Sequence, residues 1–418
     1  MNVLIIGSGG REHAVAKEFN KSKLLTKLYC SPGNAGISEI ADCVKLNLHS
    51  SSEVVEFCKT KNISFVFIGP EDPLVFGLSD ALRAAGIKVF GPSKSAAQLE
   101  GSKIFAKTFM QQAQVPTAKS FTVTTVSECM SAAQNFSAPY ILKADGLAAG
   151  KGVFICKTLK ELEDSAVLIF ENKILGDAGS KALLEANLPG YELSYFVLTN
   201  GEKFVTLPIA QDHKRLKDQN EGPNTGGMGT VAPLKIDREL ENKIIERIVK
   251  PSVDQLKKNQ LQYLGVLFIG LMIVENEPYV LEYNVRFGDP ETQVLLPLID
   301  DDVLEIFFQI ADSALSSIKF SSKAACCIVN AAPGYPEKPV KNILIQLPKG
   351  NETSYILHAG TVKSEEKILS AGGRVLNVVA VADSISEAIS SAYALNDKIE
   401  FPQRQFRTDI GKYYPKDR

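Results

Sequence analysis

The first hundred residues alternate short aliphatic runs with segments of mixed polarity. The runs NVLIIG (2–7), KLYCSPG (27–33), SFVFIGP (64–70) and KVFGP (88–92) each end in Gly or Pro. The segments between them predict helices from about residue 12, near 51–60 and near 74–85. Strands alternating with helices are typical of a parallel sheet that binds ligands at the carboxyl ends of its strands. The pattern predicts a doubly wound N-terminal domain over residues 1–102.

The pattern changes after residue 103. Helical stretches now alternate with the runs VPTAKSF (115–121) and YILKADGLAAGKGVFIC (140–156), and TNGE (199–202) is placed like a hairpin turn. The longest apolar run, YLGVLFIGLMIV (263–274), is interrupted by two glycines and is too short for a membrane span. We interpret it as a buried strand. An antiparallel sheet with helices, an α+β arrangement, is therefore predicted for 103–316.

A Ser-rich stretch, DSALSSIKFSSK (312–323), indicates the next boundary. Beyond it, AACCIVNAA (324–332) and GRVLNVVAVA (373–382) predict strands, and residues 384–396 predict a helix. We expect a small α+β domain over 322–418. The whole chain is thus predicted to be a multidomain protein that combines α/β and α+β parts.

Composition and charge exclude several kinds of partner. Forty-six basic against 48 acidic residues give a formal net charge of −2, so neither nucleic acid nor an anionic membrane is indicated. The N-terminus lacks the basic region and cleavage site of a signal peptide. Seven cysteines without a Cys-x-x-Cys pair support neither zinc nor a disulfide framework, and they indicate the reducing cytoplasm.

IIGSGGRE (5–12) resembles a dinucleotide fingerprint, but Glu12 replaces the third glycine of G-x-G-x-x-G. The second strand also lacks an acid for an adenosine ribose. A nicotinamide oxidoreductase is therefore disfavoured. Backbone amides at Gly9 and Gly10, in front of a helix, suit a phosphate-sized anion. A plain tight turn explains the motif equally well.

Two further strand ends fall on the same edge of this sheet. SPGNAG (31–36) supplies Asn34 among glycines, and GPED (69–72) supplies Pro70 and Glu71. Each alone suits an ordinary turn. Three such ends on one edge favour a site for a polar, phosphorylated molecule.

KADGLAAGKGV (143–153) places Lys143 at the end of a strand and Lys151 in a loop of small residues. Lysine holds phosphate as a point charge, and a glycine-rich backbone can close over it. The motif is not a P-loop, because Gly152 stands where a hydroxyl is required. We favour phosphate binding over a plain hairpin loop.

Other candidate residues are weaker when taken singly. Glu185 ends an apolar run and is suited to an adenine amino group, while Glu192 alternates with buried residues. Taken alone, each is better explained as a solvated charge at a strand end. GPNTGGMGT (222–230) gives a backbone that a small ligand can approach closely. Asp212 and His213 beside it are candidate acid–base residues, although for His213 a structural role is favoured.

LEYNVRF (281–287) has the period of a strand, which places Glu282, Asn284 and Arg286 on one face. A carboxylate and an amide oxygen suit Mg²⁺ together with substrate phosphates. The Arg286 guanidinium offers a fork for a carboxylate or a phosphate. The alternative, an internal Arg–Glu pair on a solvated face, is disfavoured by the glycine-rich and lysine-bearing motifs elsewhere.

These motifs occur in one order together with FGPSKSAAQLEGSK (90–103), HAGT (358–361), GGRVL (372–376) and FRTDIG (406–411). The chain therefore closely resembles the phosphoribosylamine–glycine ligase family of ATP-grasp enzymes. The resemblance covers nearly all of it. It implies a pre-ATP-grasp N-terminal domain, a central ATP-grasp region and a mobile lid at about 118–190.

The resemblance also implies a reaction. ATP phosphorylates glycine, and the amine of 5-phosphoribosylamine attacks the acyl phosphate to give glycinamide ribonucleotide, ADP and phosphate, the second step of purine synthesis. Mg²⁺ or Mn²⁺ would be held by Glu282 and Asn284. A single-function monomer is expected. The implied ATP contacts are Lys103, Lys143, Lys151, Glu185, Asn187 and Glu192.

The implied substrate sites lie at both ends of the reaction. Arg286, Asp212 and the turn of Thr225, Gly226 and Gly227 would lie near glycine, with Arg286, Asp212 and Lys143 catalytic. The loop 146–152 would exclude water from the acyl phosphate. The residues expected to line the phosphoribosylamine pocket are Gly9, Gly10, Glu12, Asn34, Pro70 and Glu71.

Three stretches depart from the family pattern. FIGLMIV (268–274) lacks the metal-binding acid that related enzymes often carry before the Glu-x-Asn strand. LEANL (184–188) places Ala186 and Asn187 in the adenine-contact stretch. KYYPKDR (412–418) follows FRTDIG where an arginine is often found.

Two alternative functions also remain, an ATP-grasp ligase for another purine precursor and an inactive nucleotide-binding regulator. The presence of Lys143, Glu282 and Asn284 disfavours the regulator.

Overall fold

A computed structural model describes residues 1–147 and 152–412. The N-terminal aliphatic runs form a parallel sheet of order β3-β2-β1-β4-β5, which confirms the doubly wound prediction. The strands are β1 (Asn2–Gly7), β2 (Lys27–Pro32), β3 (Asp42–Cys43), β4 (Ile63–Ile68) and β5 (Lys88–Phe90). The helices here are α1 (Gly10–Phe19), η1 (Ile37–Glu39), α2 (Ser51–Thr60), α3 (Glu71–Phe76), α4 (Leu78–Ala84) and α5 (Lys94–Gly101).

The prediction of one helix near 74–85 is wrong. Gly77 lies between α3 and α4 with a φ of 95°, a left-handed conformation that an α-helix cannot contain. The chain therefore turns at this residue, and α4 leaves in a new direction toward β5.

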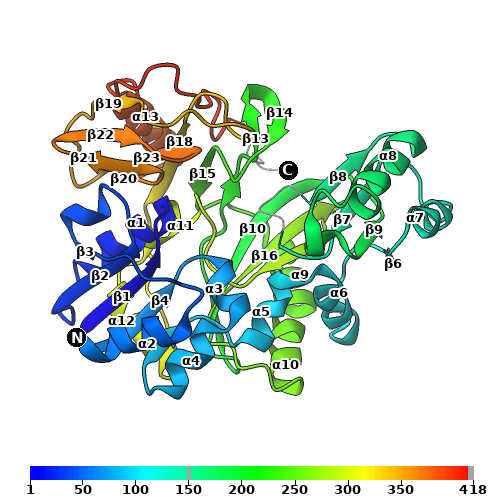
Figure 1. Cartoon of the computed structure of the whole chain (residues 1–418), viewed down its shortest axis with the longest axis horizontal. Helices are drawn as coiled ribbons and strands as arrows, with labels where there is room; N and C mark the ends of the chain where they lie inside the picture. The colour runs from blue at the N-terminus through cyan, green and yellow to red at the C-terminus, as the bar shows by residue number, and fades with distance from the viewer. Residues whose placement is uncertain (148–151, 413–418) are drawn as a thin grey trace.

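The region predicted as a lid, which we call the lid, forms a separate lobe around its own apolar core (Figure 1). Its antiparallel sheet has the order β6-β9-β7-β8. The amphipathic helices cover one face, each capped by a threonine that accepts a hydrogen bond from a backbone amide. The elements are β6 (Ser120–Val123), α7 (Val126–Ala133), β7 (Tyr140–Ala144), β8 (Val153–Cys156), α8 (Leu159–Phe170), η2 (Gly176–Gly179) and β9 (Ala182–Glu185).

The central sheet has the antiparallel order β11-β10-β16-β17. The apolar run predicted as a buried strand is β16 (Gly265–Val274), and TNGE is the hairpin turn between β10 (Tyr191–Thr199) and β11 (Phe204–Thr206), so both predictions are confirmed. The remaining strand is β17 (Glu277–Asn284), and the helices are α6 (Lys103–Gln112), α9 (Arg238–Ile244), η4 (Ile245–Val249) and α10 (Lys250–Lys258).

The C-terminal sheet is built from two separate parts of the chain. Its order is β12-β15-β18-β23-β20, so β12 (Gln211–Asp212) and β15 (Gly229–Ala232) join strands that begin only at residue 324. The helix predicted at 384–396 is α13 (Ile385–Asn396). The other elements are β13 (Arg215–Lys217), η3 (Asp218–Asn220), β14 (Glu221–Asn224), β18 (Ala324–Ala331), β19 (Leu344–Ile345), β20 (Ser354–His358), β21 (Thr361–Ser364), β22 (Lys367–Ser370) and β23 (Arg374–Ala382).

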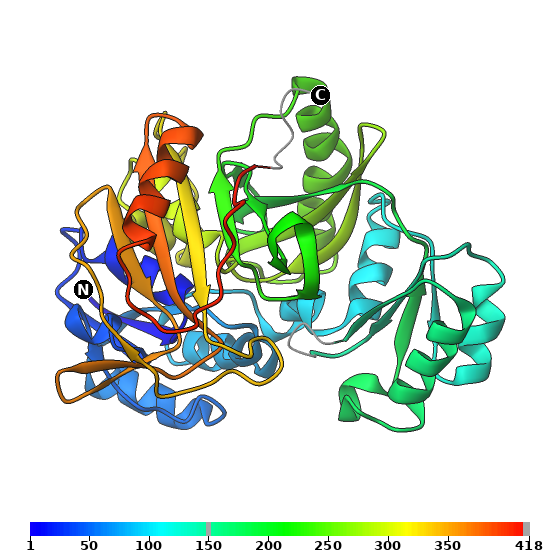
Figure 2. The same cartoon turned by 90° about the horizontal axis from the view of Figure 1, so that it is seen from above.

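The chain after β17 returns to the N-terminal sheet through α11 (Thr292–Leu295), η5 (Leu296–Leu298) and α12 (Val303–Ala311). Phe307 of α12 stacks on Phe90 with ring centroids 4.3 Å apart. Aromatic pairs of this kind add to the apolar area that they bury. The N-terminal, central and C-terminal sheets thus pack side by side, and the lid extends away from them (Figure 2).

Within the described residues, no helix is long and apolar enough to cross a membrane.

Candidate active site

One buried carboxylate connects the lid to α6. Glu185, at the end of β9, lies 2.8 Å from Nζ of Lys143 on β7 and 3.1 Å from Nζ of Lys107 on α6. The side chains of both lysines are almost completely withdrawn from water. Burial lowers the pKa of Lys107, although Glu185 opposes this. The sequence interpretation missed Lys107, whose only sequence signal is its position one helical turn after Lys103.

Lys103 is positioned by the loop that follows β7. Asp145 in this loop accepts a hydrogen bond of 2.9 Å from Ser102 Oγ and one of 2.7 Å from the Ile104 amide, so it fixes the N-terminus of α6. Burial lowers the pKa of Lys103, and Lys143 nearby lowers it further, while Glu282 opposes both. Lys103 and Lys143 therefore form one cationic group. The predicted contact Lys151 lies outside the described residues.

The cross-strand register shows which lid side chains share a face. Lys143 pairs with Val153, while Ile141 pairs with both Ile155 and Glu185. Residues directly opposite each other on antiparallel strands point to the same side. Val153 is 37% and Ile155 48% exposed, so an apolar surface lies beside the buried charges. We call these five residues the lid face.

A polar row crosses the central sheet at the point where Glu282 of β17 pairs with Gly270 of β16, which in turn pairs with Ser194 of β10. Glu192 lies two residues before Ser194 on the same side of β10. We call these four residues the central face. Asn284 continues it on β17, and its Nδ2 is buried without a hydrogen-bond partner.

The lid face and the central face approach each other. Nζ of Lys143 is 3.5 Å from the Leu281 carbonyl oxygen of β17. Glu282 is exposed, and enclosure by neighbouring elements alone would raise its pKa, but Lys214, Lys143 and Lys103 together lower it. Lys214 also lies 2.7 Å from Glu192. Lys214 was not singled out from the sequence and is a further cation of this site.

The strand predicted for LEYNVRF is correct for Glu282 and Asn284, but it ends before Arg286. β17 ends at Asn284, and its pairing with β16 is irregular between Glu282 and Val280. Arg286 therefore lies beyond the strand, where its guanidinium donates a hydrogen bond of 3.2 Å to Asn284 Oδ1. The neighbouring strand β16 has Gly270 opposite Glu282.

Two carboxylates hold Arg286. Its Nη2 is 2.8 Å from Glu100 at the end of α5, and its Nε is 3.3 Å from Glu71 at the start of α3. Glu100 was not predicted, and it also accepts a hydrogen bond of 2.7 Å from the Val285 amide. Burial raises the pKa of Glu100 to about 7, although Arg286 opposes this. Burial would also raise the pKa of Glu71, but Arg286 and Arg11 lower it.

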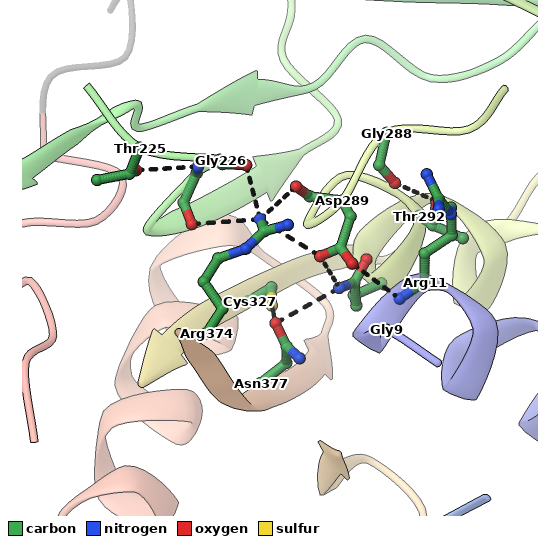
Figure 3. Close-up of polar contacts among 12 residues, drawn as sticks. Gly9, Arg11, Thr225, Gly226, Gly288, Asp289, Thr292, Cys327, Arg374 and Asn377 are labelled. Carbon is green, nitrogen blue, oxygen red and sulfur yellow. Dashed lines mark hydrogen bonds and ion pairs between the residues drawn. The ribbon is translucent and has the colours of Figure 1, made fainter. Parts of the chain in front are cut away.

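The glycine turn lies against Asp212 and Arg374. Thr225 Oγ1 accepts a hydrogen bond of 3.0 Å from the Gly227 amide, and Arg374 donates one of 2.6 Å to the Gly226 carbonyl oxygen (Figure 3). Gly227 has a φ of 112°, and a Cβ there would overlap Asp212, so glycine is required.

Asp212 retains an unused buried oxygen, since its Oδ1 has no hydrogen-bond partner. Burial and then the charge of Glu291 raise its pKa well above the ordinary value, while Lys214 and Arg374 oppose this. Glu291 is itself buried and accepts a hydrogen bond of 3.1 Å from Ser194 Oγ. The two carboxylates thus lie in one electrostatic environment. Glu291 was not predicted from the sequence.

Protein carboxylates already satisfy the start of α1. The Gly9 amide donates a hydrogen bond of 2.6 Å to the Glu12 carboxylate. The Arg11 amide donates one of 3.3 Å to Asp289, which also lies 3.5 Å from Arg374 (Figure 3). A side chain at Gly10 would overlap Asn377 of β23. The Gly9 and Arg11 amides are therefore already used within the protein.

The other strand ends of the N-terminal domain are also tightly bonded. Asn34 Nδ2 donates to the carbonyl oxygens of Ser8, at 2.8 Å, and His358, at 2.9 Å, and its Oδ1 accepts from the amides of Gly36 and Ile37. Both polar ends of the Asn34 side chain are therefore engaged. Pro70 is the N-cap residue of α3, directly before Glu71.

The structural role favoured for His213 is confirmed. Its Nδ1 lies 3.0 Å from the Gly229 carbonyl oxygen, and its Nε2 accepts 3.1 Å from the Gly411 amide. Burial, followed by the charge of Arg407, lowers its pKa to about 4. Asn187 is exposed just after β9. No group of three or more His, Cys, Asp or Glu side chains within 1–147 and 152–412 could hold a metal ion.

Family models match three successive parts of the chain. Residues 1–100, 101–292 and 325–413 match the N domain, the ATP-grasp (A) domain and the C domain of phosphoribosylglycinamide synthetase. The chain is 40% identical over 417 residues to phosphoribosylamine–glycine ligase of Caldanaerobacter subterraneus, covering 99% of this chain and 100% of that protein.

Solved structures give the same result. The crystal structure of phosphoribosylamine–glycine ligase from Thermotoga maritima superposes with a TM-score of 0.87 at 35% identity, covering 98% of this chain and 100% of that one. The biotin carboxylase domain of 2-oxoglutarate carboxylase from Hydrogenobacter thermophilus, solved with MgADP and bicarbonate, shares the fold at 18% identity with a TM-score of 0.72, covering 97% and 91%. The chain belongs to the phosphoribosylglycinamide synthetase family.

Proposed function

We propose that this protein ligates glycine to the amine of 5-phosphoribosylamine with ATP, through glycyl phosphate, in the second step of purine synthesis. Its products are glycinamide ribonucleotide, ADP and phosphate. The observation that carries this proposal is the apposition of the lid face, with Lys143 and Glu185, to the central face, with Glu282. Family membership supplies the substrates.

The nucleotide lies between the two faces in this proposal. The base packs on Val153 and Ile155, which form an exposed apolar surface on β8. Lys143 and Lys103 neutralise phosphate charge, and phosphoryl transfer depends mainly on such positioning and neutralisation. The remaining proposed nucleotide contacts are Lys151, Glu185, Asn187 and Glu192.

The donor set on β17 fits a divalent cation. Glu282 offers a carboxylate and Asn284 an amide oxygen, both hard ligands of the kind that Mg²⁺ and Mn²⁺ accept, and Gly270 opposite leaves room beside them. When bound, the ion would neutralise charge on the ATP phosphates. The three lysines around Glu282 keep its carboxylate ionised and ready to coordinate.

Glycine is proposed to bind between Arg286 and the turn at 225–227. A carboxylate oxygen of glycine attacks the γ-phosphorus, and the bond to the leaving oxygen of ADP breaks. The amine nitrogen of phosphoribosylamine then attacks the carbonyl carbon, and phosphate leaves with the electron pair of the C–O bond. Asp212, whose Oδ1 is free of hydrogen bonds, receives the proton that the amine loses.

Phosphoribosylamine is proposed to bind at the edge of the N-terminal sheet next to Arg286. Glu71, 3.3 Å from Arg286, connects that edge to the glycine end of the site. Because the Asn34 side chain is fully engaged, its contribution would come from its backbone. The other proposed contacts are Gly9, Gly10, Glu12 and Pro70.

We also propose that the enzyme works as a monomer in the cytoplasm. All of the cysteines lie within the described residues and each is free, which suits a reducing compartment. Analytical ultracentrifugation of the purified chain tests the oligomeric state. A sedimenting species of twice the chain mass would contradict the monomer.

The test of function is an ADP-release assay with ATP, Mg²⁺, glycine and freshly prepared phosphoribosylamine. Release must depend on both acceptors, and the product must carry glycine on the ribosyl amine. ADP release that ignores phosphoribosylamine would overturn the assignment. Turnover with a different purine precursor in place of phosphoribosylamine would favour the other ATP-grasp ligase considered from the sequence.

A further inference from the structure

The motif FRTDIG (406–411), which the proposed reaction does not use, lies along the hairpin of β13 and β14. Figure 2 shows this C-terminal segment, in red, passing beside the green strands of the central region. We call residues 407–411 the strap. The hairpin and the strap are almost two hundred positions apart in sequence, yet hydrogen bonds join them throughout.

Arg407 is the central residue of the strap. Its side chain is fully buried and forms a two-point ion pair with Asp409 at 2.7 and 2.8 Å. Its Nη1 donates to the Arg215 carbonyl oxygen at 3.2 Å and to Asn220 Oδ1 at 2.9 Å. A buried guanidinium needs such partners for each edge of its fork. Two of these partners belong to the hairpin.

The tip of the hairpin is held from both sides. The Asp409 carboxylate accepts a hydrogen bond of 2.8 Å from the Gln219 amide. The Asp218 carboxylate accepts one of 2.8 Å from the Thr408 amide and one of 2.5 Å from the Thr408 hydroxyl. Gln219 and Asn220 have φ values of 59° and 57°, a conformation that costs free energy in residues other than glycine. The contacts with the strap stabilise this unusual turn.

The base of the same hairpin carries the active-site groups. The Lys214 carbonyl oxygen accepts from the Thr225 amide at 2.8 Å and from the Thr225 hydroxyl at 2.7 Å, which closes the hairpin. Lys214 then reaches Glu192 on the central face, and the glycine turn begins directly after Thr225. At the strap end, Gly411 donates to His213, the residue between Asp212 and Lys214.

We propose that the strap is a positioning segment that holds the β13–β14 hairpin so that Lys214 and the glycine turn are aligned for the reaction. Arg407 acts through the hairpin and does not touch substrate. The C-terminal region thereby completes a site whose ligands come from the other parts of the chain. This inference rests on the proposed placement of glycine beside the turn at 225–227.

The test uses the full-length protein with Arg407→Lys, which keeps the charge but cannot satisfy Asp409, Arg215 and Asn220 together. We expect the KM for glycine to rise at least fivefold and by more than the KM for ATP, which the strap reaches only through the pair of Lys214 with Glu192. Arg404→Lys is the matched control, because Arg404 donates to Asn396 within the C-terminal region and not to the hairpin. A loss of stability alone would lower the active fraction and leave every KM unchanged.

A second variant, Asp218→Ala, breaks the Thr408 contacts from the partly exposed hairpin side and keeps the strap intact. We expect faster amide hydrogen exchange over 214–227 in Arg407→Lys and Asp218→Ala but not in Arg404→Lys. Unchanged exchange, or unchanged kinetic constants, would overturn the proposal. Faster exchange with a raised KM for ATP or phosphoribosylamine instead of glycine would support the strap and refute the placement of glycine.

Discussion

Lys107 lies 3.1 Å from the Glu185 carboxylate and so shares this buried group with Lys143. Lys107 also donates hydrogen bonds of 2.6 Å to Thr117 Oγ1 and of 2.9 Å to the Ala118 carbonyl oxygen, in the segment that enters the lid. One ammonium group thus contacts both chain segments at the base of the lid. The position of Lys143 therefore depends on a residue outside the lid.

Replacing Lys107 by Met should raise the KM for ATP about tenfold, because Glu185 loses one of two buried partners and Lys143 shifts toward it. The measurement is initial ADP release across ATP concentrations. Lys119→Met is the control, since that exposed lysine lies over the Phe121 ring beside the same segment. Equal ATP constants for the two variants would refute the role of Lys107.

Replacing Glu282 by Gln should lower kcat on the order of 100-fold, because the central face loses the carboxylate proposed to bind the metal. Binding of phosphoribosylamine should change little. Glu277→Gln is the control on the same strand, where Glu277 pairs with Lys243 at its exposed end. A wild-type rate for Glu282→Gln at saturating Mg²⁺ and ATP would contradict the metal role.

Replacing Ile155 by Ser should raise the KM for ATP about fivefold, since the base then covers less apolar surface, worth roughly 1 kcal/mol. The kcat should be nearly unchanged. Leu168→Ser, at a comparably exposed apolar position on lid helix α8, is the control. If both variants bind ATP like the wild type, the lid face does not hold the base.

Acidification should destabilise the contact between α1 and β20. The His13 and His358 rings lie 5.7 Å apart, and the His358 amide donates 2.8 Å to His13 Nδ1. Burial, then His358 and Lys17, lower the pKa of His13 to about 3, and burial lowers that of His358 to about 4. Both rings are therefore neutral in the folded protein at pH 5.5.

The unfolded chain, in which histidine has a pKa of about 6.5, binds protons first as the pH falls. The stability from each neutral ring is fully present above about pH 6.5 and is lost toward pH 4. As the pH falls from 7 to 5.5, we expect each of the two histidines to lower the free energy of unfolding by about 1 kcal/mol. Urea denaturation of His358→Gln should show a pH dependence weaker by that amount, and exposed His49→Gln should not. If the stability of His358→Gln depends on pH as strongly as that of the wild type, the role of His358 is refuted.

The sequence predicts best what depends on local periodicity. Glu282 and Asn284 share a face because both lie within β17, and β16 was recognised from a long apolar run that only two glycines interrupt. The strand was predicted too long, because it ends two residues before Arg286, which ion pairs with Glu100 and Glu71 hold in place. A period-2 pattern does not show where pairing stops.

The unpredicted residues depend on contacts between distant segments. Lys107 and Glu100 look like ordinary helix residues until β9 and the chain after β17 pack against them. Likewise, the Gly9–Gly10 motif suits an anion as well as a turn, and Asp289, which accepts from the Arg11 amide, lies far along the chain. No local pattern encodes which partner arrives.

The mixed C-terminal sheet also has a consequence for synthesis of the protein. β15 pairs with β18, so its edge stays open on the ribosome until Ala324–Ala331 has emerged. An open edge of this kind invites pairing with another chain. The chain is therefore exposed to aggregation after β15 has been made and before β18 has emerged. If the gene were cut near residue 320, each of the two fragments would carry a strand without its partner.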